Sequence, residues 1–246
     1  MVVCTGSGIV SSCSKNEIEE NGPSGNGSSN SLIGVENGHE WVDLDLPSGT
    51  RWATCNVGAS SPEEYGDYFA WGETTGKNSG KTAFKWENYK YSYGSTDLLT
   101  KYCSIANCGY EGFTDDMREL QLGDDAAREN WGGSWQTPSL AQVQELLGDS
   151  TRKVWTTQDG VNGLLIVRES RNNWSKSTGK SIFLPAAGHQ VNSGAEDIGN
   201  GGYYWTRSLS VGYPGSACSL HIRSGQTNVS TYYYRYIGRS VRPVCK

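Results

Sequence analysis

The pattern of apolar and polar positions first becomes regular near residue 38. Residues 41–46, Trp-Val-Asp-Leu-Asp-Leu, alternate apolar and acidic side chains with the period of a β-strand. Residues 47–49, Pro-Ser-Gly, are a turn signal, and residues 50–57 form a second strand-like run. The pattern therefore predicts an N-terminal β-hairpin and a folded domain that begins at residue 38.

Three segments carry helix signals. Residues 61–64, Ser-Pro-Glu-Glu, have the composition of a helix start, and residues 124–131 resemble a helical turn that two glycines end. Residues 139–142 have the form of a capping box, and apolar residues at helical spacing follow on one face. We therefore expect short helices after residues 61 and 124 and a longer one over 140–148.

The second half of the chain is typical of antiparallel strands, whereas residues 72–123 show little periodicity and predict loops. Few early helices followed by many strands indicate an α+β domain and argue against alternating βαβ units. Glycine-marked turns separate most of the strands that we expect, which cover residues 153–157, 164–168, 181–184, 203–207, 217–223, 229–236 and 240–244.

Composition supports a single loop-rich domain. The 246 residues are 35% hydrophobic and 11% aromatic, enough for one sizeable core. The 32 glycines and 9 tryptophans, against only 4 phenylalanines and 2 methionines, indicate many turns rather than a helical bundle. No run approaches the roughly 18 consecutive apolar residues that a membrane helix needs.

The N-terminal region resembles that of a bacterial surface lipoprotein. Residues 9–13, Ile-Val-Ser-Ser-Cys, are similar to a lipobox, in which Cys13 would be lipidated after cleavage of a signal at 1–13. The apolar stretch is short and no basic residue precedes Cys13, so either the signal starts upstream or the match arises by chance. Residues 14–37 are first acidic and then rich in Gly, Ser and Asn, which predicts a flexible linker to a domain at 38–246. This order predicts a protein anchored by lipid in the outer membrane and exposed at the cell surface.

Charge and tyrosine content distinguish the last 49 residues from the rest of the chain. The chain carries a formal charge of −5, from 21 basic and 26 acidic residues. Residues 198–246 hold five arginines, one lysine and no acid, so this tail contributes +6 and the remainder 15 − 26 = −11. Seven of the 14 tyrosines lie in the same 49 residues. Tyrosine and arginine are enriched in recognition surfaces, which makes the tail the candidate binding region.

Several ordered blocks resemble the Fibrobacter succinogenes major paralogous domain family, which is widespread in Bacteroidetes surface proteins. The resemblance covers residues 39–245 and is carried by the blocks HEWVDL at 39–44, LPSGTRWATCNVG at 46–58, EYGDYFAWGE at 64–73, NWGGSWQTP at 130–138 and SIFLPAAG at 181–188. It implies a C-type-lectin-like fold of the formylglycine-generating-enzyme type. In that fold a Gly-Gly-Ser-Trp element helps to hold the core, so we expect mainly structural roles for Trp52, Trp71, Trp131, Trp135 and Trp205.

The ending of the chain also resembles variable proteins that retroelements diversify, in which substituted positions are scattered over a fixed scaffold. This likeness, together with the tail's composition, predicts a binding surface. Leu220 and Ile222 should face the core, and Ser219, His221 and Arg223, which alternate with them, should point outward. Two arrangements remain open for the tyrosines of 232–236: a strand with one packed face and one exposed face, or a more irregular loop that is wholly exposed. The candidate ligand-binding residues are Tyr203, Tyr204, Arg207, Ser219, His221, Arg223, Tyr232, Tyr233, Tyr234, Tyr236 and Arg239.

The expected ligand is a protein or a glycan, acidic or sugar in character, because the tail lacks acidic residues. The alternative is a structural or adhesin component of the envelope or a pilus, which docks one fixed partner through the tail. An enzyme of the formylglycine-generating type is less favoured, because no catalytic constellation assembles from the sequence. The net charge argues against nucleic acid.

No metal or other cofactor is expected. The sequence has no Cys-x-x-Cys pair and no paired histidines at ligand spacing. The triplets of lectin-type calcium sites, Glu-Pro-Asn or Gln-Pro-Asp with Trp-Asn-Asp, are also absent from it. The spacing of the cysteines permits Cys103–Cys108 and Cys218–Cys245 disulfides, but the sequence does not decide connectivity.

Overall fold

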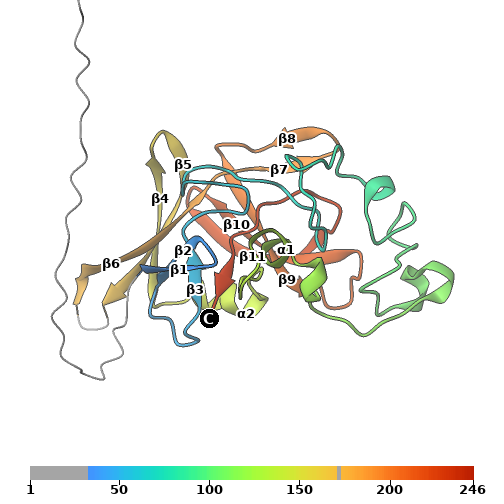
Figure 1. Ribbon diagram of the computed structural model, residues 1–246, viewed down its shortest axis with the longest axis horizontal. Helices are drawn as coiled ribbons and strands as arrows, with labels where there is room; N and C mark the ends of the chain where they lie inside the picture. The colour runs from blue at the N-terminus through green and yellow to red at the C-terminus, as the bar shows by residue number, and fades with distance from the viewer. Residues whose placement is uncertain (1–32, 171–172) are drawn as a thin grey trace, which may run out of the picture. The chain divides into compact units, whose positions relative to one another are not determined.

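The computed structural model describes residues 33–170 and 173–246, which belong to one compact unit (Figure 1). The lipobox with Cys13 and the linker as far as residue 32 lie outside the described residues. Within the described residues, no helix combines the length and the apolar character needed to cross a membrane.

Antiparallel sheets dominate the unit, and every pairing between its described strands is antiparallel. Four strands form the first sheet, in the order β1-β2-β3-β12, and the other sheets have the orders β11-β10-β9, β4-β5-β6 and β7-β8. The strands are β1 (Ile33–Glu36), β2 (His39–Asp43), β3 (Arg51–Ala53), β4 (Thr151–Gln158), β5 (Val161–Ser170), β6 (Asn173–Pro185), β7 (His189–Val191), β8 (Gly194–Glu196), β9 (Gly201–Leu209), β10 (Ser216–Arg223), β11 (Gln226–Tyr234) and β12 (Val244–Cys245).

Two α-helices form where capping signals predicted them. In α1 (Ala126–Trp131), the Asp125 carboxylate accepts hydrogen bonds from two backbone N–H groups, and Gly132 ends the helix at φ 66°. In α2 (Leu140–Leu146), Ser139 and Gln142 form the complete capping box. Few helices with antiparallel strands agree with the predicted α+β class at this coarse level.

The helix predicted after residue 61 is wrong. Residues 61–64 form a single turn with one backbone hydrogen bond, from Glu64 N to Ser61 O at 3.3 Å. Gly66 follows at φ 73°, so the chain changes direction there. A single turn has too few hydrogen bonds to offset the unfavourable free energy of helix nucleation. Residues 72–123 are loop-rich as predicted, and carry the short 3₁₀ helices η1 (Trp86–Asn88), η2 (Ala106–Cys108) and η3 (Tyr110–Gly112), with η4 (Leu122–Asp124) just after them.

The domain begins earlier than residue 38, because residues 33–36 form β1 along β2. Glu36 then joins this edge to the Gly-Gly-Ser-Trp segment. Its carboxylate accepts a hydrogen bond from Ser134 N at 2.7 Å, and its backbone carbonyl accepts one from Trp135 Nε1 at 2.8 Å. The linker predicted at 14–37 is therefore too long at its C-terminal end.

Gly133 lies at this junction, and its replacement by alanine should lower the free energy of unfolding by about 2–4 kcal/mol. Its φ is +55°, and a Cβ there would lie 2.5 Å from Glu36 Oε1. Gly160→Ala is the matched control, because Gly160 has φ +81° but nothing within 4 Å of its added Cβ. We expect the control to lose only about 1 kcal/mol in urea unfolding. Equal losses in the two variants would contradict the proposed close approach.

The sheet β9–β10–β11 lies between two hydrophobic clusters. Tyr204, Leu220 and Ile222 pack on one side with residues of α2, β5 and β6, whereas Trp205 and Ala217 pack on the other side with residues from the loops. In Figure 1 the β4–β5–β6 sheet lies at the left and the loop-rich segment reaches out to the right. All five tryptophans predicted to be structural are buried, and so are Leu220, Ile222, Val241 and Val244.

Candidate functional site

The tyrosines at the end of β11 alternate between solvent and core, as the strand period predicts. Tyr232 and Tyr234 are 62% and 49% exposed. Tyr233 is half-buried, and Arg235 is fully buried on the opposite side. The strand ends at Tyr234 rather than at residue 236, because residues 235–237 turn away from the sheet.

Five rings form a partly exposed group that we call the aromatic surface: Trp86, Tyr213, Tyr232, Tyr234 and Tyr236. Tyr213 and Tyr232 meet edge to face with ring centroids 4.8 Å apart. Trp86 contacts Tyr234 at 5.9 Å and Tyr236 at 5.1 Å, again edge to face. Trp86 and Tyr213 lie outside the predicted site. The sequence signal for Tyr213 was its place in a Gly-Tyr-Pro-Gly turn, whereas Trp86 comes from the loop-rich segment and had none.

Three of the tail's five arginines are buried, which corrects the expectation of a basic surface. Arg235, Arg239 and Arg242 are at most 1% exposed. No ion pair to any of them forms within the described part of the chain. The other two arginines are each paired: the half-buried Arg207 with Glu119 at 2.9 Å, and the exposed Arg223 with Asp197. The excess positive charge of the tail therefore lies mostly inside the domain.

Arg239, predicted to face the ligand, is instead surrounded by rings. Its guanidinium carbon lies 4.0 Å from the ring centre of Tyr233, 4.7 Å from Trp205 and 5.3 Å from Tyr203. Its Nη1 donates hydrogen bonds to Ser219 Oγ at 2.5 Å and His221 Nε2 at 2.8 Å, while its Nε has no partner. Burial lowers the pKa of Arg239 to about 9, so the group is still a cation at neutral pH.

Tyr204 and Ser219 are also buried rather than displayed. Tyr204 is 2% exposed and donates its hydroxyl hydrogen bond to Pro185 O at 2.5 Å. Ser219 has no exposed surface because it is covered on the same side of β10 as Arg239, where we expected residues to point outward. Tyr204 and Ser219 therefore have structural roles beneath the surface, and a ligand cannot contact them without a change in structure.

His221 is partly exposed and lies over Arg239. Because an arginine has only donors, His221 Nε2 must accept the hydrogen bond, which leaves the ring proton on Nδ1. Burial and, second, the charge of Arg239 lower the pKa of His221 to about 3. The imidazole is thus a neutral group that offers an N–H donor.

A polar pocket of about 230 Å³ opens beside His221 at the end of the β9–β10–β11 sheet. Tyr203 is 5% exposed; its hydroxyl donates to Asp197 Oδ2 at 2.5 Å and accepts from Arg223 Nη2 at 2.5 Å. The sequence analysis did not include the amide side chains of Gln226 and Asn228 on β11. They are two residues apart, so the strand period could have placed them on one face. The pocket is lined by Tyr203, His221, Arg223, Gln226, Asn228 and Tyr233.

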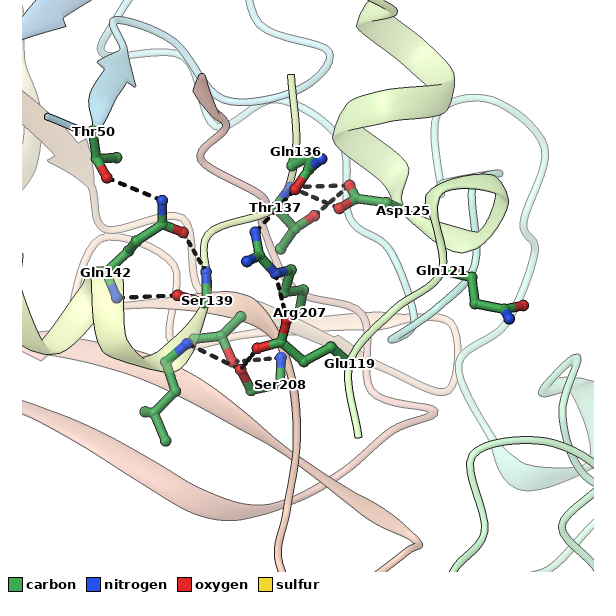
Figure 2. Close-up of polar contacts among 12 residues, drawn as sticks. Thr50, Glu119, Gln121, Asp125, Gln136, Thr137, Ser139, Gln142, Arg207 and Ser208 are labelled. Atoms are coloured by element: carbon green, nitrogen blue, oxygen red, sulfur yellow. Dashed lines mark hydrogen bonds and ion pairs between the residues drawn. The ribbon is translucent and has the colours of Figure 1, made fainter. Parts of the chain in front are cut away.

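Arg207 lies in a different place from the other predicted site residues. Its Nε donates to Glu119 Oε2 at 2.9 Å and its Nη1 to Gln136 Oε1 at 3.0 Å (Figure 2). It lines a cavity of about 580 Å³ with Glu36, Arg128 and Gln142, near the junction of β1 with the α1–α2 segment. The predicted site therefore divides into three parts: the aromatic surface, the polar pocket and the Arg207 cavity.

The described residues contain no group of three or more His, Cys, Asp or Glu side chains arranged to hold a metal ion. The five cysteines among them, Cys55, Cys103, Cys108, Cys218 and Cys245, are free thiols, so neither of the two permitted disulfides is formed. Burial raises the pKa of Cys218 and raises that of Cys245 to about 11. These two thiols are therefore protonated and unreactive at neutral pH.

Comparisons with family models, with curated proteins and with solved structures give no match to this chain.

Proposed function

We propose that the chain is a ligand-binding protein displayed at the cell surface, with its C-terminal part as the recognition surface. The observation that carries this proposal is the aromatic surface. Its members Tyr213, Tyr232 and Tyr234 are 49–62% exposed and sit in ring contact with one another or with Trp86. The two sets of ring contacts meet on β11, where Tyr232 and Tyr234 are two residues apart on the exposed face. Such a gathering of exposed large rings is typical of an interaction site.

The remaining parts of the proposal rest on the sequence. The fold is of the C-type-lectin-like, formylglycine-generating-enzyme type, Cys13 carries a lipid that anchors the protein in the outer membrane, and a retroelement diversifies the tail. The pattern of exposure supports the third part, because a buried frame of Trp205, Leu220, Ile222 and Val241 leaves exposed positions between its members. The function does not include catalysis, and the partner is a protein or a glycan.

Replacing Tyr232 and Tyr234 together by alanine should weaken ligand binding at least about tenfold, since truncating central aromatic contacts commonly costs 2 kcal/mol or more. Glycan and protein arrays probed with the wild type and the variant measure the loss. Ile33→Ala with Val35→Ala is the control, because these side chains are 58% and 64% exposed but lie on β1 in another sheet. The control should bind like the wild type.

Unchanged array binding by the tyrosine variant would contradict the proposed surface. A single protein that copurifies with the chain through these tyrosines, with no array ligand, would favour the structural or adhesin alternative. Thermal unfolding of the variant should match the wild type, because both side chains are exposed.

A further inference from the structure

The polar pocket lies directly over a buried positive charge that lacks a counter-ion. Arg239 is 1% exposed, and its nearest groups are ring faces and the neutral acceptors Ser219 and His221. A buried cation without a carboxylate is costly, because aromatic faces and neutral dipoles repay only part of the lost hydration. A negative group bound nearby would supply the missing compensation.

His221 connects the charge of Arg239 to the pocket, because its ring accepts a hydrogen bond from Arg239 and also lines the pocket. Its Nε2 is held by Arg239, so Nδ1–H is a donor that the cation behind the ring polarises. The ring is one of the pocket's lining groups. His221 therefore brings a neutral ring with an Nδ1–H donor to the lining of the pocket, and its lowered pKa keeps the ring neutral at physiological pH.

Arg223 supplies a second donor at the rim, where its side chain is 48% exposed. Its Nε and Nη2 bind Tyr203 and Asp197, whereas its Nη1 has no partner among the described residues. Asp197 is occupied by Tyr203 and Arg223, so its charge is already compensated. The exposed amides of Gln226 and Asn228 add further neutral donors to the same opening.

The size and walls of the pocket restrict what these donors can bind. About 230 Å³ is less than the roughly 300–1,000 Å³ of sites for drug-sized ligands, and accommodates one ring-sized group. Tyr203 is buried and Tyr233 is half-buried, so of the two lining rings Tyr233 is the one that can pack against the C–H face of a sugar ring. The combination of an aromatic wall with an excess of donors favours a sugar that carries an anionic group.

We propose that this pocket binds one carboxylated sugar residue of a glycan, with its carboxylate held by Arg223 and by the Nδ1–H of His221. The inference deepens the proposed function and rests on it, since it assigns a ligand class to one part of the same surface. It accounts for the absence of a protein counter-ion at Arg239, because the ligand carboxylate approaches from the open side of His221.

The test titrates the full chain with methyl β-glucuronide and with methyl β-glucoside, which differ only by the carboxylate. Ring resonances of the three histidines in an NMR spectrum report the location, because only His221 lines the pocket. We expect the glucuronide to shift the His221 signals and to bind at least about tenfold more tightly than the glucoside, since charge-assisted hydrogen bonds are about twice as strong as neutral ones.

Arg223→Gln should remove this preference, whereas Arg152→Gln should keep it. Arg152 is the matched control because it is similarly exposed, at 54%, and is also ion-paired, with Glu169 at 3.1 Å. Equal affinity for the two sugars, no shift of His221 at about 50 mM glucuronide, or a preference that survives in Arg223→Gln would each overturn the inference. A shift of His221 with a glutamate-rich peptide but not with the glucuronide would also overturn it and assign the pocket to protein side chains.

The two proposals fail separately. Array binding that is lost in the Tyr232 and Tyr234 variant but kept in Arg223→Gln leaves the proposed function standing and overturns the pocket assignment. Glucuronide binding at His221 without any array ligand for the aromatic surface supports the pocket and contradicts the proposed surface.

Discussion

Replacing Arg242 by methionine should lower the free energy of unfolding by about 3–5 kcal/mol, because each buried acceptor left without a donor costs about 1–3 kcal/mol and removal of the buried charge offsets only part of that cost. Its guanidinium donates to Asn56 Oδ1 at 2.9 Å, to Ala53 O at 3.1 Å, to Thr54 O and to Phe183 O at 2.9 Å. One side chain thereby joins the end of the first sheet to β6. Methionine keeps the length of the side chain but provides no donor, so all four acceptors lose this partner.

Arg207→Met is the control for this prediction. Arg207 is also a tail arginine on the scaffold, but its side chain is 24% exposed and its ion pair with Glu119 is open to water. We expect a loss of about 1 kcal/mol or less, as for other surface ion pairs. Urea unfolding of the two variants, followed by tryptophan fluorescence, measures the difference. If Arg242→Met lowers the free energy of unfolding by less than about 1 kcal/mol, or by as much as Arg207→Met does, the hydrogen bonds of Arg242 between the first sheet and β6 do not stabilise the fold as proposed.

The sequence predicted those features whose physical causes are local. The capping box at Ser139 and the glycine that ends the helix before residue 132 depend on atoms within about four residues, and both are present. Alternation placed Leu220 and Ile222 in the core, as the structure shows. For the tyrosines of β11 the sequence left a two-faced strand and an exposed loop open, and the structure has the strand. Large rings have little alternative to burial in a domain of this size, so the structural role of the tryptophans was also predictable.

Features that depend on distant partners were missed. Residues 33–36 have a polar, glycine-rich environment in the sequence, and become a strand only because β2 and the Trp135 segment supply partners. The failed helix at residues 61–64 has a local cause instead, because the chain turns at Gly66 before a helix can grow. Local signals therefore gave the wrong result at β1, where distant neighbours determine the backbone, and at residues 61–64, where a turn follows the helix start too soon.

The arginines are the largest discrepancy between sequence and structure. Their charge suggested a basic recognition surface, but burial of a guanidinium depends on carbonyl oxygens and ring faces that the sequence does not locate. Arg235 donates to the carbonyls of Lys101 and Tyr102, which are 134 and 133 residues away. Arginine suits this role because its planar group presents several donors and stacks on rings. The candidate binding region consequently consists of tyrosines, neutral donors and one exposed arginine, Arg223, rather than of a broad cationic surface.

Stability should fall between pH 7 and pH 5 by about 1–2 kcal/mol on account of His221. Its pKa in the folded protein is lowered to about 3, chiefly by burial, whereas in the unfolded chain it is about 6.5. Below pH 6.5 the unfolded state binds a proton that the folded state does not, so acid favours unfolding. The contribution is absent above pH 6.5 and grows by at most about 1.4 kcal/mol per pH unit down to about pH 3.

His221→Gln isolates this contribution, because the glutamine oxygen can accept the hydrogen bond from Arg239 Nη1 but does not titrate in this range. Urea unfolding at pH 7, 6 and 5 should show a smaller loss for the variant than for the wild type. His189 remains in both proteins, and burial lowers its pKa too, so its contribution cancels in the comparison. NMR signals of the His221 ring should not titrate between pH 7 and pH 4. A midpoint near pH 6.5, or equal pH dependence in the two proteins, would show that burial and Arg239 do not keep His221 neutral, and the proposed Nδ1–H donor of the pocket would then no longer be fixed.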